Sequence, residues 1–221
     1  MRRRAYITYA LLAIQIIIYL LMEVTGSSLS ISTLLHFGAK ENALIAIYGQ
    51  YWRLITPIFV HIGFSHLLFN SITLWYLGSE VEGIIGSWRF LFIYLYSGIM
   101  GNLFSYQFST SVSAGASTAL FGLFAFFLAM RYLNPHDRYF QAMGYQYQTL
   151  IILNIVMNLF MANVDMSGHI GGIVGGFLAT LIITNNPKHR LSSILLSILV
   201  YSVIAGIIIA NHGAFNTLFI H

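Results

Sequence analysis

The sequence predicts an all-α membrane protein, a polytopic bundle of seven transmembrane helices. Of its 221 residues, 58% are hydrophobic and only 7% are charged, whereas about a quarter of the residues in an ordinary soluble domain are charged. Apolar stretches long enough to cross a bilayer recur along the whole chain. We therefore expect one multi-pass integral membrane domain over residues 1–221, embedded in a lipid bilayer.

The first apolar stretch runs from Tyr6 to Val24 and follows Arg2, Arg3 and Arg4. A removable signal peptide also places basic residues before an apolar core, but its core is shorter and a small-x-small cleavage pattern follows it. We expect a retained transmembrane helix instead.

The segment at about residues 26–63 is too long for a turn and too mixed in polarity for a span. Apolar residues alternate there with the charged residues Lys40, Glu41 and Arg53. This composition predicts short amphipathic helices in the outer membrane interface.

Six further apolar stretches complete the predicted bundle. Asn134-Pro135 and Asn186-Pro187 mark two of the turns between them. The core of the domain would occupy about residues 6–184, and the last stretch would add a C-terminal helix at about residues 191–210. The six stretches are Phe64 to Leu77, Phe90 to Gln107, Ala116 to Tyr132, Tyr147 to Ala162, His169 to Thr184 and Leu191 to Ala210.

The basic residues predict the orientation. In the seven-helix arrangement only Lys40 and Arg53 lie on one side, and an excess of Lys and Arg marks the cytoplasmic side. The N-terminus would be cytoplasmic, in a bacterial cell membrane, and the C-terminus outside. The residues on the other side are Arg2, Arg3, Arg4, Arg89, Arg131, Arg138, Lys188 and Arg190.

Charge and cysteine content exclude other classes of protein. The net charge is +4, but the basic residues end apolar runs rather than gathering with aromatic residues, so we expect no nucleic-acid partner. The chain has no cysteine, which excludes disulfides, thiolate metal sites and a cysteine nucleophile.

Polar residues stand at the outer ends of three predicted spans. Ser117 opens the fourth stretch and His169 the sixth, while His61, His66 and Asn70 accompany the start of the second. An unpaired polar group costs several kcal/mol in lipid, so these residues either bond to one another or serve chemistry. His66 and Asn70 are four residues apart and share a helix face.

Small residues at four-residue spacing predict close packing of the fourth and sixth helices. Generic helix packing in a membrane would also explain them. They are Ala114, Thr118 and Gly122 on the fourth stretch and Gly168, Gly172 and Gly176 on the sixth.

A serine and a histidine in contact can perform acyl transfer, because a neutral imidazole activates the hydroxyl by taking its proton. The backbone N–H of Ser117, the His66 ring and the Asn70 amide are candidate donors to an oxyanion. Phe121 lies one turn after Ser117 and would stack on the His169 ring. Each residue also has a plainer explanation. Asn70 could tether two helices, His66 could face water, and Phe121 could face lipid.

The same histidines and a nearby carboxylate also allow two other arrangements. His61, His66 and His169 offer three nitrogens to a metal, but no carboxylate or cysteine completes a set at metal spacing, so we expect no metal and no cofactor. Asp165 lies four residues before His169. It is either a third member that orients the imidazole or a loop carboxylate that faces water.

Several separated motifs together resemble the rhomboid intramembrane serine proteases. The resemblance covers roughly Tyr51 to Thr184, and Glu82 before Gly86 is similar to the glutamate that follows the second span in that family. The motifs are Tyr51-Trp52-Arg53, the His61, His66 and Asn70 spacing, Gly115-Ala116-Ser117, and the His169, Gly172 and Gly176 spacing.

The resemblance implies a core of six spans plus one C-terminal span, with Ser117 as nucleophile and His169 as general base. His66, Asn70 and the Ser117 amide would donate to the oxyanion, and Phe121 would stack on the base. Trp52 and Arg53 would brace the outer loop. Thr118 stands where many members have glycine, which predicts a tighter turn and a smaller substrate pocket.

The expected function is therefore an endopeptidase that cleaves single-span membrane proteins near the outer face through an acyl-enzyme. Water would come from a polar cavity that includes Asn163, and substrates would enter past the fifth span and the loop around Met161 to Met166. The alternative is a catalytically silent member that binds membrane clients. A transporter would need a polar path across the whole bilayer, which the sequence lacks.

Overall fold

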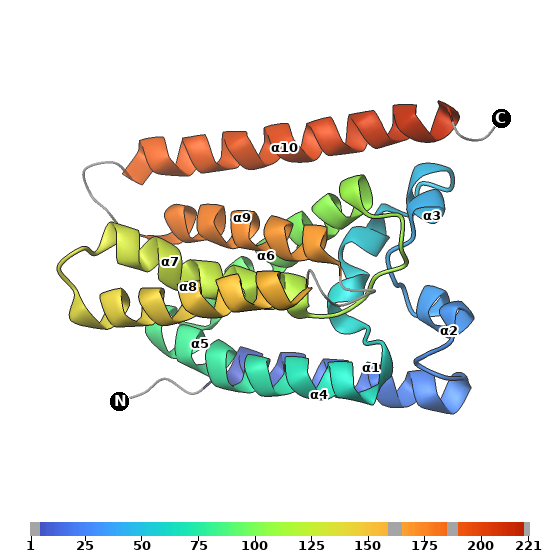
Figure 1. Ribbon diagram of the computed structural model, residues 1–221, viewed down its shortest axis with the longest axis horizontal. Helices are drawn as coiled ribbons and strands as arrows, with labels where there is room; N and C mark the ends of the chain where they lie inside the picture. The colour runs from blue at the N-terminus through green and yellow to red at the C-terminus, as the bar shows by residue number, and fades with distance from the viewer. Residues whose placement is uncertain (1–4, 159–164, 185–189, 219–221) are drawn as a thin grey trace.

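The computed structural model describes residues 5–158, 165–184 and 190–218, and this part of the chain is helical (Figure 1). Most of the long helices run along one common direction, with α1 beginning at one end of the molecule and α10 ending at the other. Lys40 and Ser113 form an isolated antiparallel bridge. The described residues otherwise contain no strand, which agrees with the predicted all-α class.

Short helices occupy the segment between the first two long ones and gather at the end of the molecule opposite the start of α1 (Figure 1). Along the chain the elements are α1 (Tyr6–Thr25), α2 (Ile31–His36), α3 (Asn42–Ala46), η1 (Tyr51–Leu54), η2 (Thr56–Phe59), α4 (Gly63–Thr73), η3 (Leu74–Gly78), α5 (Ser79–Ile85), α6 (Ser87–Phe108), α7 (Ser117–Leu133), α8 (Arg138–Asn158), α9 (Met166–Ile183) and α10 (Arg190–Leu218).

Several helices are longer than the apolar pattern predicts, and the second span and α8 show two physical reasons. The π-helical η3 joins α4 to α5 in one rod that ends before Gly86, whose φ of 85° breaks the helix. The start of α8 is too polar to read as a span, but Gln141 donates to the Arg131 carbonyl at 2.9 Å and Gln148 accepts from Arg131 at 2.6 Å. These bonds hold the polar turns of α8 against the end of α7.

The outer surface of the bundle is apolar. Among the described residues, three helical segments are long and apolar enough to cross a membrane: Tyr6–Thr25, Met166–Ile183 and Leu191–Asn211. Only 11% of the Leu191–Asn211 span is buried inside the protein. Since so much exposed apolar surface is unfavourable in water, the helices face lipid and the protein is an integral membrane protein.

Helices α6, α7 and α9 form the centre of the bundle. The approach of α9 to α7 is close enough that a Cβ on Gly172 would overlap the Thr118 carbonyl oxygen, and a Cβ on Gly176 would overlap the backbone of Gly122. Gly172, Gly176, Thr118 and Gly122 therefore form the close packing that their spacing predicts. Ala114 does not belong to it, because α7 begins only at Ser117.

The remaining helices pack around this centre. On α10, Tyr201 packs its ring 3.8 Å from the ring of Tyr96 on α6 and donates to the Tyr96 carbonyl at 3.2 Å. On α8, Tyr147 stacks on Phe124 and Phe127 of α7, with ring centroids 5.5 Å and 4.6 Å apart. Aromatic contacts thus supply much of the peripheral packing.

Glu82 joins α5 to the start of α1. It is fully buried, and its carboxylate accepts from the backbone N–H groups of Ile7 and Thr8 at 3.0 and 2.8 Å and from the Thr8 hydroxyl at 2.8 Å. Ser87 adds a fourth bond at 2.6 Å. Because the residue before α1 offers no side-chain cap, Glu82 satisfies amides that would otherwise lack partners.

We expect Gly176→Ala to lower the free energy of unfolding by about 1–3 kcal/mol, because the new methyl group has no space against Gly122. Gly206→Ala is the matched control, since nothing lies within 4 Å of a Cβ at Gly206. Thermal unfolding in detergent measures both variants. Equal midpoints for the two would contradict the packing described for α7 and α9.

We expect Glu82→Ala to destabilise the protein by about 3 kcal/mol, because buried donors at the start of α1 lose a charged acceptor. Glu82→Gln keeps the volume and one acceptor oxygen, so its thermal midpoint should fall between those of wild type and Glu82→Ala. An unchanged midpoint in Glu82→Ala would show that Glu82 does not cap α1.

Candidate active site

Ser117 and His169 lie in hydrogen-bond contact. The Ser117 Oγ and His169 Nε2 atoms are 3.0 Å apart, and they belong to the first turns of α7 and α9. The glycine contacts between these two helices lie directly below. Because both side chains stand at the same ends of closely packed helices, residues far apart in sequence meet in one place.

Phe121 holds the plane of the imidazole. Its ring lies 4.2 Å from the His169 ring with an angle of 18° between the planes. Phe121 is one turn below Ser117 on α7 and is itself buried. The stacking therefore fixes the tilt of His169 relative to the hydroxyl, as its position on the helix predicts.

Tight backbone packing positions the turn before Ser117. Gly115 has a φ of 139°, its N–H donates to the Pro57 carbonyl at 2.8 Å, and a Cβ there would lie 2.5 Å from the His66 ring. Only glycine combines this conformation with this contact. The turn therefore brings the His66 ring next to the residues that precede Ser117.

His61 also contacts the turn that precedes Ser117. Its Nε2 accepts from the Ala116 N–H at 3.4 Å, and its ring packs edge-on against His66 with centroids 5.4 Å apart. Burial, together with nearby His66, lowers the pKa of His61 to about 3. The ring is thus neutral at ordinary pH, which leaves Nε2 free to accept from the backbone.

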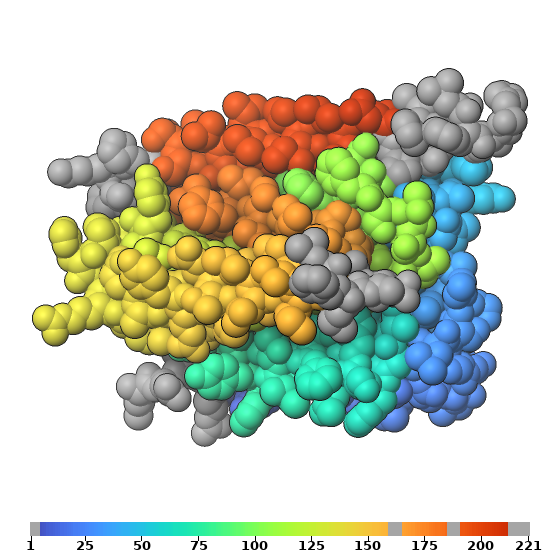
Figure 2. Space-filling view, in the orientation of Figure 1, coloured from blue at the N-terminus to red at the C-terminus, as the bar shows by residue number. Residues whose placement is uncertain are grey.

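His66 and Asn70 line the same cavity as Ser117 and His169. The cavity has a volume of about 1460 Å³ and extends between α4 and α8, whose surfaces adjoin on one face of the molecule (Figure 2). Asn70 donates one amide hydrogen to the His66 carbonyl at 2.8 Å. A side-chain amide carries a second hydrogen, so Asn70 has a donor left for a group in the cavity.

Arg53 braces the segment at residues 26–63. Its Nη1 donates to the carbonyls of Leu35 and Ala39 at 2.9 and 2.8 Å, and its Nε donates to Gln50 at 2.7 Å. The guanidinium also lies 4.3 Å from the centre of the Trp52 ring. Trp52 and Arg53 thus join parts of the 26–63 segment that would otherwise be held only by short helices.

Lys40 holds the loop that leads to Ser117. The residue is fully buried, and its Nζ donates to the carbonyls of Ser109 and Ser111 at 2.8 and 3.0 Å. The backbone of Lys40 also exchanges two hydrogen bonds with Ser113, at 2.8 and 3.1 Å. Lys40, a charged residue of the 26–63 segment, therefore fixes the loop between α6 and α7.

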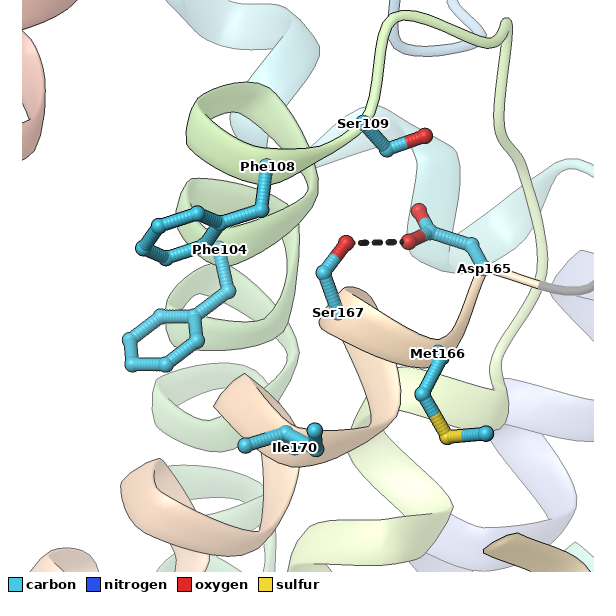
Figure 3. Close-up of a pocket in the computed structure, with 7 residues that line it drawn as sticks. All are labelled: Phe104, Phe108, Ser109, Asp165, Met166, Ser167 and Ile170. Atoms are coloured by element: carbon cyan, nitrogen blue, oxygen red, sulfur yellow. Dashed lines mark hydrogen bonds between the residues drawn. The ribbon is translucent and has the colours of Figure 1, made fainter. Parts of the chain in front are cut away.

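Asp165 begins α9 as its N-terminal cap. Its carboxylate accepts from the Gly168 N–H at 3.0 Å and from the Ser167 hydroxyl at 2.6 Å, the bond drawn in Figure 3. Figure 3 also shows Asp165 and Ser167 beside Phe104 and Phe108 at the end of α6. These two bonds of the Asp165 carboxylate cap its own helix, and among the hydrogen bonds of the described residues none joins the carboxylate to the His169 ring.

Thr118, which is expected from the sequence to narrow the substrate pocket, packs between helices. A Cβ on Gly101 or on Gly168 would meet the Thr118 side chain, at 2.5 and 3.2 Å respectively. Thr118 is buried and is not among the residues that line the cavity. Its side chain fills the contact between α6, α7 and α9, so it adds packing and takes no cavity volume.

Sequence reasoning missed Asn158, the last residue of α8. Its side-chain amide lies 3.1 Å from His169 Nδ1, the ring nitrogen opposite the one that faces Ser117. An asparagine inside a predicted apolar span was the available signal. Asn163 and most of the loop around Met161 to Met166, which were assigned to water and substrate entry, lie outside the described residues.

We expect the stability of the protein to depend on the titration of Lys40. Burial lowers the pKa of Lys40 to about 8 from its usual value of 10.5, while the charges of Asp165 and Glu41 act in the opposite direction. Between these two pH values the unfolded chain binds a proton that the folded chain lacks, so stability rises with pH there.

The measurement compares the thermal midpoints of wild type and Lys40→Met across this window. The midpoint of wild type should rise relative to that of Lys40→Met as the pH increases from 8 to 10.5. A difference that stays constant or falls would show that Lys40 is not a buried, partly neutralised amine.

Comparison with known proteins matches the sequence of this chain to one family. The model of the Rhomboid domain matches residues 48–186, which include Ser117, His169, His66 and Asn70. The chain is 46% identical over 172 residues to "Rhomboid protease GluP" of Bacillus subtilis, a match that covers 78% of this chain and 34% of that protein.

Eukaryotic relatives align over similar lengths. "RHOMBOID-like protein 5" of Arabidopsis thaliana is 37% identical, with 72% of this chain and 52% of that protein covered. "Rhomboid-like protease 1" of Toxoplasma gondii is 36% identical, with coverages of 65% and 50%. The chain thus spans about a third of the length of the Bacillus protein and about half the length of the other two. The helical architecture, the buried site and these matches together show that the chain belongs to the rhomboid family.

Proposed function

We propose that this protein is an intramembrane serine endopeptidase that cleaves single-span membrane proteins near the outer face of the membrane. The observation that carries the proposal is the 3.0 Å contact of Ser117 Oγ with His169 Nε2 inside a large cavity. The names of the Bacillus and Toxoplasma relatives, which call them proteases, support the same activity.

The proposed reaction begins with the attack of Ser117 Oγ on a peptide carbonyl, while His169 Nε2 takes the hydroxyl proton. The tetrahedral intermediate collapses, His169 gives that proton to the leaving amine, and an ester with Ser117 remains. Water then attacks the ester with His169 again as the base. Phe121 holds the plane of the imidazole during both proton transfers, because its ring stacks on that of His169.

The developing negative charge needs hydrogen-bond donors. The Ser117 N–H stands at the start of α7, where the backbone amides have no partner within the helix and the helix dipole favours an anion. The remaining hydrogen of the Asn70 amide and the His66 ring lie along the same cavity. These three groups form the proposed oxyanion site.

We further propose the seven-span, 6+1 arrangement with the N-terminus in the cytoplasm and the C-terminus outside. The helix ends that carry Arg89, Arg131 and Arg138 gather at the end of the molecule where α1 begins, opposite Lys40 and Arg53 (Figure 1). A cluster of basic residues at one end favours a cytoplasmic position for that end. Ser117 and His169 then lie towards the outer side.

The same arrangement supports a single domain with membrane proteins as substrates. The cavity is bordered by α4 and α8 on the lipid-facing side of the bundle, and exposed apolar residues of both helices surround it. A single-span helix would reach Ser117 from the bilayer without passing through water. We expect no metal ion, cofactor or nucleic acid in the reaction.

We expect purified wild-type protein in proteoliposomes to cleave a generic single-span substrate, and Ser117→Ala and His169→Ala to lose this activity. Removal of the nucleophile or of its base stops acyl-enzyme formation. The readout is the amount of product on a gel after incubation of each variant at equal concentration. A wild-type protein that binds the substrate and leaves it intact would be a catalytically silent member of the family, which overturns the proposal.

We expect Asn70→Ala and His66→Ala each to lower kcat by about a hundredfold to a thousandfold, the usual effect of one oxyanion donor. Ser71→Ala is the control, because Ser71 neighbours Asn70 on α4 but does not line the cavity. Steady-state cleavage of the same substrate measures all three variants. Wild-type kcat in Asn70→Ala would remove that residue from the proposed site.

A further inference from the structure

Asn158 contacts the side of His169 that faces away from the nucleophile. The Asn158 amide nitrogen, Nδ2, is 3.1 Å from His169 Nδ1, while His169 Nε2 is 3.0 Å from Ser117 Oγ. A histidine can accept the serine proton at Nε2 only when its own proton sits on Nδ1. The partner of Nδ1 therefore determines whether His169 is ready to act as a base, which is the role that the proposed function gives it.

The two ends of the Asn158 amide have opposite effects on His169. When the NH₂ group faces Nδ1, the ring proton must sit on Nε2 and point at Ser117, so the ring cannot take the serine proton. When the oxygen faces Nδ1, it accepts the Nδ1 hydrogen and leaves Nε2 free. In the structure the NH₂ group faces Nδ1, and a half turn of the amide about its terminal torsion brings the oxygen to the same place, which gives the second arrangement.

The other neighbours of His169 do not perform this task. The Asp165 carboxylate accepts hydrogen bonds from Gly168 and Ser167, and among the hydrogen bonds of the described residues it makes none to the His169 ring. Phe121 restrains the plane of the ring but has no polar atom that could select a protonated nitrogen. Among the hydrogen bonds of the described residues, the contact with Asn158 is the one made by His169 Nδ1.

The contact also depends on the position of α8. The buried residues of this helix are Gly144, Tyr147 and Ile151, and none of its residues from Ile152 to Asn158 is buried. Asn158 thus extends from the loosely packed end of α8, which borders the cavity. A displacement of this end would take the partner away from His169.

We propose that Asn158 is a positioning residue, which accepts the Nδ1 hydrogen of His169 through its amide oxygen and so holds the base in its active tautomer. The inference rests on the proposed protease function. It adds a third residue, from α8, to the Ser117 and His169 pair. It also joins the helix that borders the cavity to the base.

The test compares Asn158→Leu with Asn158→Asp in proteoliposomes, with a single-span substrate and separate determination of kcat and KM. Leucine has a similar volume but cannot accept a hydrogen bond, so kcat should fall by about tenfold to hundredfold, a part of what a general base supplies. KM should stay within about twofold of wild type, because chemistry rather than binding is affected. Aspartate only accepts, so Asn158→Asp should keep kcat within about threefold of wild type.

Thr149→Ala is the matched control on α8. Thr149 is exposed, and its hydroxyl bonds to the Tyr145 carbonyl of its own helix at 3.0 Å, so its loss should leave kcat and KM at wild-type values. Thermal midpoints of all variants show whether α8 still folds. Wild-type kcat in Asn158→Leu, or equal loss in Asn158→Asp and Asn158→Leu, would overturn the proposal. An inactive wild type would instead overturn the proposed function itself.

Discussion

The close approach of α7 and α9 is the constraint on which the rest of the structure depends. Ser117 and His169 form their 3.0 Å hydrogen bond at the start of two helices whose backbones lie nearer to each other than ordinary side chains permit. Gly172 and Gly176 remove the Cβ atoms that would prevent this contact. In lipid, where apolar burial does not drive helices together, such backbone packing also supplies much of the association energy.

Buried polar groups gather at one end of the bundle, where they hold the backbone around the site. Lys40, His61 and Asp165 bind backbone atoms in the segments that lead to Ser117 or His169. Arg53 binds the carbonyls of Leu35 and Ala39 in the segment that carries Lys40. Each of these side chains would be costly inside a membrane protein without partners. Together they hold a loop and a helix start in place, so the two reacting side chains are positioned before any substrate arrives.

Much of the site could be predicted because polar residues stand out in an apolar chain. Ser117, His169, His66 and Asn70 open spans, and helical periodicity alone places His66 and Asn70 on one face. The four-residue spacing predicts that Thr118 faces the sixth helix, but its contact with Gly101 could not be predicted, because Gly101 lies on another helix, α6. The contacts of Asn158 and Lys40 were not predicted for the same reason, since their partners lie on other segments of the chain. No sequence pattern indicated that η3 would extend the second span.

The most direct test of the account is covalent labelling by a fluorophosphonate, a reagent that reacts with an activated serine and needs no substrate. Mass spectrometry of the intact protein and of its peptides would locate the adduct. The account predicts one adduct, on Ser117, in wild type and none in His169→Ala, because the hydroxyl reacts only with its base in contact. An unlabelled wild type, or equal labelling of Ser117 in His169→Ala, would contradict it.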